Sequence, residues 1–175
     1  MDDIRQATIT FSGTLTREEF DEAVAATGLF QRLRWLIWVA AVLLAALSLR
    51  PLAHGGAVNA GLLALGVVYG VLGLFLPPLL SGRAFRADQA RGEKQAVIDA
   101  AGFVVARGGE ELMRVPWGTM YRARETERVY VVTGRFGWKG GLLIVPKRLL
   151  AGAGEAELMG VLLETGVRRF KRHRP

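Results

Sequence analysis

The stretch from Trp35 to Leu80 constrains this chain more than any other feature. Arg50 is its only charged side chain, whereas a helix on the surface of a soluble domain carries polar residues along one face. A helix needs about 20 apolar residues to cross the hydrocarbon layer of a membrane. The stretch therefore predicts a transmembrane hairpin within 35–82, with membrane-spanning helices over about 35–52 and 57–80.

Basic residues flank both predicted helices on the same side. Two precede the first helix and four follow the second: Arg32, Arg34, Arg83, Arg86, Arg91 and Lys94. Short segments rich in Lys and Arg stay on the cytoplasmic side of a membrane. Both termini are therefore expected in the cytoplasm.

Small residues recur at four-residue spacing in both predicted helices. Gly66 and Gly70 form a GxxxG pattern in the second helix, and Ala41 and Ala45 form the equivalent pattern in the first. Small side chains let helices approach closely in lipid. These residues either pack the hairpin together or pair two copies of the chain, and packing within the hairpin is the simpler interpretation because the pattern is common in apolar helices.

Residues 1–34 predict one strand and one helix. Residues 7–12 alternate apolar and polar side chains, as a half-buried strand does. Thr16 precedes Glu19 by three positions, which is the spacing of a capping box at a helix start. The acidic residues of this first turn are expected to be solvated and to match the helix dipole. One strand and one helix cannot bury a core alone, so this cytoplasmic segment is expected to pack on the C-terminal domain.

Residues 83–175 predict a β-rich domain closed by a helix. Strands are expected over 103–107 and 111–115, around Gly108-Gly109, and again over 120–126, 129–133 and 142–145. A helix beginning near Gly154 follows and ends in a basic tail. Several antiparallel strands closed by one helix indicate a small barrel or a strongly bent sheet.

Charge and motifs narrow the function class. Residues 83–175 carry eighteen basic and ten acidic side chains, whereas residues 1–34 carry four and six. A basic domain beside a membrane is attracted to anionic headgroups, so we expect the lipid bilayer and not nucleic acid as the partner. The chain has no cysteine and two histidines, and no hydrolase, nucleotide or metalloprotease motif. We therefore expect a protein that is not an enzyme and that holds no cofactor or metal.

A glycine-rich loop is predicted over 134–141. Phe136 and Trp138 lie there between Arg135 and Lys139, an arrangement typical of a loop tip that enters the membrane interface. The alternative is that one of the aromatic rings packs on the sheet. The other candidate membrane or partner contacts are basic residues: Lys147, Arg148, Arg168, Arg169, Lys171 and Arg172.

Several short motifs resemble the YcxB-like family. They are Val115-Pro116-Trp117-Gly118 before a strand, the turn Glu125-Thr126, Ile144-Val145-Pro146-Lys147-Arg148 before the last helix, and the opening Phe11-Ser12-Gly13-Thr14 ahead of two spans. The predicted loop over 134–141 departs from the family pattern in its length. The resemblance implies a multi-pass protein of a bacterial inner membrane with a pleckstrin-homology-like (PH-like) cytoplasmic domain. It carries no established activity and no catalytic residues.

These observations combine into one hypothesis of fold and function. The fold is expected to be an α+β membrane protein in which the hairpin is inserted between an N-terminal strand–helix unit and a PH-like domain. This requires contact between the strand at 7–12 and the C-terminal sheet. The expected function is binding or scaffolding at the inner leaflet, through anionic lipid or through a protein partner or second copy. The alternative is an accessory or regulatory subunit of a membrane transporter or membrane enzyme.

Overall fold

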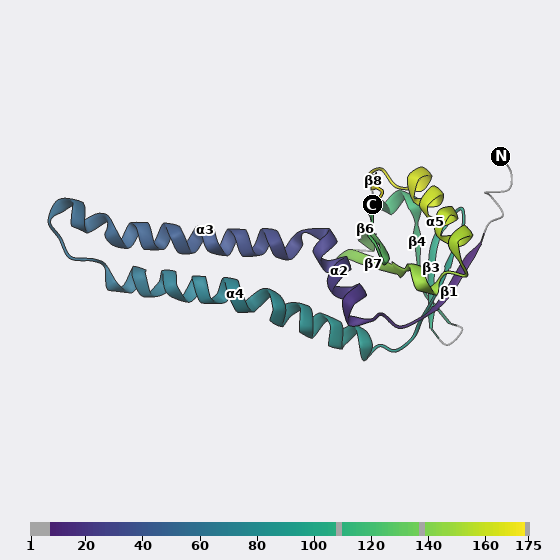
Figure 1. Cartoon of the computed structure of the whole chain (residues 1–175), viewed down its shortest axis with the longest axis horizontal. Helices are drawn as coiled ribbons and strands as arrows, with labels where there is room; N and C mark the ends of the chain where they lie inside the picture. Colours follow the sequence, from purple (N-terminus) through teal and green to yellow (C-terminus); the bar gives the residue numbers. More distant parts are fainter. Residues whose placement is uncertain (1–7, 108–109, 137–138, 174–175) are drawn as a thin grey trace. The chain divides into compact units, whose positions relative to one another are not determined.

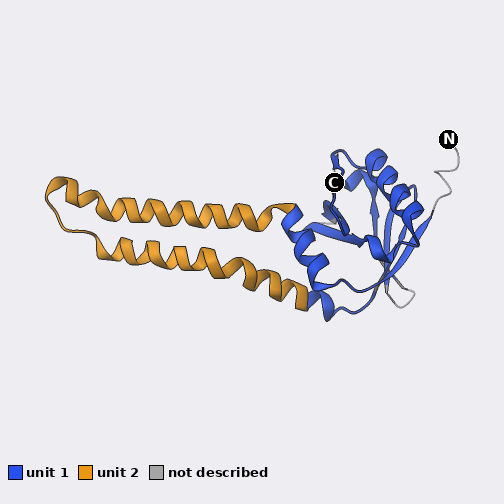
Figure 2. Ribbon diagram, in the orientation of Figure 1, with its two compact units in different colours: residues 1–26, 87–175 blue, residues 27–86 orange. Residues whose placement is uncertain are grey.

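The chain divides into two compact units in a computed structural model that describes residues 8–107, 110–136 and 139–173. Unit 1 combines Met1–Ala26 with Ala87–Pro175, and unit 2 consists of Thr27–Arg86 (Figure 2). Unit 1 therefore contains both ends of the chain, and unit 2 is inserted into it. The elements of both units are labelled in Figure 1.

Unit 2 consists mainly of two long apolar helices. α3 spans Leu29–Leu49, the short helix η1 spans Arg50–His54, and α4 spans Ala60–Gln89, so that the end of α4 reaches unit 1. The two helical segments have mean hydropathies of 2.0 and 2.1, and only 11% of the most apolar window of each is buried. By length and composition, both are able to cross a membrane.

Each helix extends beyond its predicted span at one end and stops short of it at the other, since α3 begins before residue 35 and α4 continues past residue 80. α3 begins at Leu29, directly after Gly28. This glycine has a left-handed conformation with φ of 68°, and it alone separates α3 from the preceding helix. α4 continues through Pro77 and Pro78. Each proline removes only one backbone donor, and the hydrogen bonds of the other turns carry the helix to Gln89.

The first sheet of unit 1 is an antiparallel meander. It consists of β1 (Ile9–Gly13), β2 (Lys94–Ile98), β3 (Gly102–Arg107) and β4 (Glu110–Pro116), in that order. β1 pairs with β2 along its whole length, which is the contact that the insertion hypothesis requires. No strand was predicted over residues 94–98 from the sequence.

The second sheet has the order β7-β6-β5-β8. Its strands are β5 (Met120–Glu125), β6 (Val129–Phe136), β7 (Lys139–Pro146) and β8 (Phe170–Lys171), and β8 is parallel to β5. β6 and β7 remain paired as far as Phe136 and Lys139. The predicted glycine-rich loop over 134–141 is therefore wrong for most of its length. Gly134 faces Gly141 and Arg135 faces Gly140 across this strand pair.

The main core lies among the two sheets and α5 (Ala153–Gly166). Phe103, Met120 and Met159 are at most 1% exposed in it. The rings of Phe103 and Trp117 meet edge to face with their centroids 5.1 Å apart, and the indole N–H of Trp117 donates to the Asp99 carbonyl at 3.0 Å. The fold is α+β, as expected.

A smaller core joins the N-terminal helix to the second sheet. α2 (Arg17–Thr27) packs Ala23 against Val129 and Val131 of β6, with Ile144 of β7 beside them. The other face of β6 lies in the main core. A strand buried on both faces is apolar at consecutive positions, as Val129 to Val132 are apart from the hydroxyl of Tyr130.

Candidate functional site

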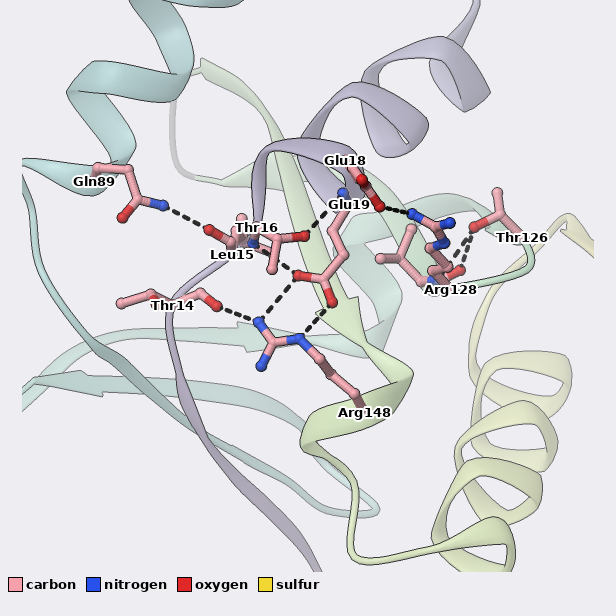
Figure 3. Close-up of polar contacts among 10 residues, drawn as sticks. Thr14, Leu15, Thr16, Glu18, Glu19, Gln89, Thr126, Arg128 and Arg148 are labelled. Atoms are coloured by element: carbon pink, nitrogen blue, oxygen red, sulfur yellow. Dashed lines mark hydrogen bonds and ion pairs between the residues drawn. The ribbon is translucent and has the colours of Figure 1, made fainter.

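The predicted capping box at the start of α2 is confirmed. The backbone N–H of Glu19 donates to the Thr16 hydroxyl at 3.3 Å, and the N–H of Thr16 donates to the Glu19 carboxylate at 2.8 Å (Figure 3). Each side chain therefore satisfies a donor that a helix start leaves without a partner. Close by, the amide of Gln89 donates to the Leu15 carbonyl.

Glu19 has a second role that the sequence did not indicate. It is only 4% exposed, and it accepts two hydrogen bonds from Arg148, Nε to Oε1 at 2.7 Å and Nη2 to Oε2 at 3.1 Å (Figure 3). Burial raises the pKa of the Glu19 carboxyl, but hydrogen bonds from Arg148 and Thr16 and the charge of Arg148 outweigh burial and hold this pKa below its usual range. The expectation of a solvated first turn is wrong for Glu19.

The rest of α2 is held by the turn between β5 and β6. The guanidinium of Arg128 pairs with Glu18. The backbone N–H of Arg128 donates to the carboxylate of Glu22 at 3.1 Å. Near the end of α2, Arg124 Nη1 donates to the carbonyl of Ala26 at 2.8 Å. Carbonyls at a helix end have no partner inside the helix, so Arg124 acts as a C-terminal cap.

Lys147 is also bound within unit 1. Its ammonium lies 2.8 Å from Glu125 Oε1 and 5.1 Å from the centroid of the Tyr130 ring. Burial, then the charge of Glu125 and a hydrogen bond to it, raise the pKa of the Tyr130 hydroxyl to about 12. Lys147 and Arg148, both candidate membrane contacts, thus each have a carboxylate partner inside the unit.

The tail after α5 folds back onto the second sheet. The N–H of Ala123 donates to the Arg169 carbonyl at 2.8 Å, and Phe170 and Lys171 pair with β5 as strand β8. The expected basic tail is therefore partly a strand. Val167 is buried and Phe170 packs against the main core. These apolar residues within the basic run were the sequence signal that the tail packs on the domain.

An open groove of about 1410 Å³ lies beside this tail. α2, the β5–β6 turn, the end of α5 and the tail line it, and we call it the tail groove. The arginine and lysine residues that line it are Arg124, Arg128, Arg168, Lys171 and Arg172, and His173 lines it as well. Its carboxylates are Glu22, Glu125, Glu127 and Glu164. The structure thus brings three of the four tail candidates together with Arg124.

The cations of the tail groove differ in their partners. Arg128 pairs with Glu18, and Arg172 lies 3.1 Å from Glu164. Arg124 binds a carbonyl and no carboxylate. For the side chains of Arg168 and Lys171, both exposed, no hydrogen bond or ion pair is found within the described ranges. Three positive charges of the groove thus have no carboxylate partner among the described residues.

The remaining membrane-contact candidates that the structure describes do not line this groove. Arg169 contributes its backbone carbonyl to the sheet, and its side chain does not line the groove. Arg135 is exposed near the end of β6. Trp138 and the side chains of Phe136 and Lys139 lie outside the described part of the chain.

The small residues of unit 2 divide between two environments. A Cβ atom at Gly66 would lie 3.1 Å from the Ala41 carbonyl oxygen and 3.4 Å from the Ala45 backbone nitrogen. Gly66 therefore packs within the hairpin, against the two alanines. At Gly70 a Cβ atom would meet nothing within 4 Å. The GxxxG pattern thus contributes one glycine, and not two, to this contact.

Comparisons provide no assignment beyond this geometry. Among the described residues, no group of three or more His, Cys, Asp or Glu side chains is arranged to hold a metal ion. No family model, curated protein or solved structure matches the chain. The resemblance to the YcxB-like family stays a prediction.

Proposed function

We propose that this protein is a two-span inner-membrane protein whose unit 1 binds phosphate-bearing lipid headgroups in the tail groove. The observation that carries the proposal is the set of three groove cations without a carboxylate partner, Arg124, Arg168 and Lys171. Arginine and lysine side chains are the usual partners of phosphate oxygens. The role is one of binding or scaffolding, without catalysis.

The chain itself favours a lipid as the source of the phosphate. Ala26 lines the groove and precedes Leu29, the first residue of α3, by three positions. Three residues extend over at most roughly 10 Å. If α3 crosses the membrane, its start lies near the headgroup layer, and basic residues close to an anionic surface each contribute about 1 kcal/mol to attraction.

The architecture of unit 1 supports the PH-like assignment that the resemblance implies. Antiparallel strands in two sheets precede a single C-terminal helix, α5, which packs into the core between them. The hairpin enters between β1 and β2. A domain entered and left through one hairpin is held at the membrane by two connections, which suits a module that presents a binding surface there.

Membrane topology is tested first. Because the chain has no cysteine of its own, a thiol reagent labels only the introduced residue. Single cysteines replace Thr10, Gly55 or His173 in the full chain. We expect a membrane-impermeant maleimide to label position 55 on intact cells, and positions 10 and 173 only after permeabilisation. Labelling of all three positions from one side would contradict two membrane crossings.

Lipid binding is tested on the whole detergent-solubilised chain, because unit 1 is assembled from both ends. Native mass spectrometry measures adducts with a short-chain phosphatidylglycerol. We expect Arg168→Gln/Lys171→Gln to reduce the adduct at least fivefold, since hydrogen bonds to charged groups contribute about 1.5–3 kcal/mol each. The control is Arg122→Gln/Arg169→Gln, which removes the same charge outside the groove. Equal losses in both variants would show that net charge alone, and not the groove, attracts the lipid.

A further inference from the structure

We infer that the tail groove selects a headgroup that carries a primary amine together with its phosphate, as ethanolamine and serine headgroups do. This inference rests on the proposed function and refines it. The distinguishing observation is that the groove is lined by carboxylates as well as by cations.

Two of these carboxylates have a cation that compensates them. Glu164 pairs with Arg172, and Glu125 pairs with Lys147. These pairs are part of the unit's own structure and leave little charge for a ligand.

The other two carboxylates have no such pairing. Glu22 accepts a hydrogen bond from the uncharged backbone N–H of Arg128, and Glu127 has no hydrogen bond or ion pair within the described residues. Both contribute, after Glu18, to raising the pKa of Arg128. Their negative charge thus acts on the guanidinium of Arg128, which Glu18 already binds.

The unpaired charges of opposite sign come from different elements. Glu22 belongs to α2 and Glu127 to the β5–β6 turn, whereas Arg168 and Lys171 belong to the tail. A ligand with phosphate alone gains from the tail and is repelled by the carboxylates. A ligand with phosphate and ammonium gains from both. Discrimination between ligands arises from such a repulsive element as well as from the attractive one.

The groove has room for a headgroup of this kind. Its volume of about 1410 Å³ exceeds the 300–1,000 Å³ typical of small-molecule pockets. Thr126 also lines it, but its hydroxyl is bound to the backbone of Val129. The size admits a whole headgroup, so the charge pattern and not the volume decides selectivity.

The experiment offers the full detergent-solubilised chain equal amounts of short-chain phosphatidylserine and phosphatidylglycerol. Both headgroups carry one net negative charge, and only the serine headgroup has an amine. We expect the phosphatidylserine adduct to exceed the phosphatidylglycerol adduct about threefold in native mass spectra, which corresponds to one exposed ion pair.

Two variants locate the preference. Glu127→Gln is expected to bring the adduct ratio to about one while phosphatidylglycerol binding stays equal or rises. Glu157→Gln, which removes an equivalent charge from α5 outside the tail groove, is expected to keep the threefold ratio. Unchanged circular dichroism spectra and melting curves show that both variants are folded.

The outcomes separate this inference from the proposed function. Equal adducts of both lipids that still fall in Arg168→Gln/Lys171→Gln overturn the amine selectivity and leave headgroup binding in place. A preference that persists in Glu127→Gln also overturns it. Adducts insensitive to the tail substitutions overturn headgroup binding in the groove itself.

Discussion

The two units expose the same kinds of apolar side chain in opposite ways. In unit 1, Ile9 and Phe103 are 0% exposed, whereas Leu36 and Phe75 of unit 2 are 69% and 60% exposed. Soluble proteins rarely leave such large contiguous apolar surface in water. Unit 1 thus buries its large apolar side chains, whereas unit 2 exposes them on two helices that are long and apolar enough to cross a membrane.

The interiors differ as well. Unit 1 is filled by large side chains such as Phe103, Trp117 and Met120. Unit 2 brings its helices together at Ala41 and Gly66. Burying apolar surface drives folding in water, but lipid tails are as apolar as leucine, so close backbone approach at small residues drives packing between helices.

The largest expected effect tests the contrast in exposure. Phe103→Ala leaves a cavity in the core of unit 1 and should lower its free energy of unfolding by about 3–5 kcal/mol. Leu36→Ala removes a side chain of unit 2 that is 69% exposed. This variant should change the free energy of unfolding of unit 2 by less than about 0.5 kcal/mol. Pulse proteolysis in urea and mild detergent measures both. A similar loss in the two variants would mean that α3 is buried by the protein itself.

An intermediate effect concerns the salt bridge that holds α2 in unit 1. Glu19→Gln should lower the free energy of unfolding by about 2 kcal/mol, because Arg148 and the Thr16 N–H lose a charged acceptor. Glu18→Gln is the matched control, since its pair with Arg128 is exposed on both sides and such pairs contribute about 0–1 kcal/mol. Equal effects would show that burial of Glu19 adds nothing.

The same salt bridge has a predicted pH dependence. The pKa of Glu19 is lowered on folding from its ordinary value of 4.5, so the stabilising effect of the ionised carboxylate is complete above that value. It is lost as the pH falls through the lower pKa of the folded state. Urea titrations of the wild type and Glu19→Gln should therefore converge in acid and differ at neutral pH.

The smallest expected effect concerns the hairpin seam. Gly66→Leu forces α4 away from the Ala41 carbonyl and should destabilise unit 2 by about 1–2 kcal/mol. Gly70→Leu enters open space and should be nearly neutral. Thermal loss of helical circular dichroism in detergent measures both. If Gly70→Leu instead dissociates an oligomer, seen by size-exclusion chromatography with light scattering, then Gly70 packs between copies of the chain.

Local patterns account for what the sequence predicted well. The apolar run from Trp35 to Leu80 predicts two long helices because each turn depends only on neighbouring residues. The capping box of Thr16 and Glu19 and the strand pair around Gly108-Gly109 are likewise short-range features. A large part of the secondary structure therefore follows from residues close together in the chain.

Contacts between distant residues required the tertiary structure. β2 is only five residues long, and pairing with β1 and β3 makes it a strand. β8 is a strand only because Ala123 and the core accept the tail. No spacing in the sequence indicated that Arg148 would bind Glu19.

The tail groove shows the same division. The sequence by itself identified the basic tail and the two apolar helices, since charge and hydropathy are properties of composition. Only the fold brought Arg124 of β5 and Glu127 of the β5–β6 turn beside the tail. The hydrogen bonds and the buried apolar area of the fold form only when chain segments far apart in the sequence come into contact. The pattern of residues along the sequence does not show which segments these are.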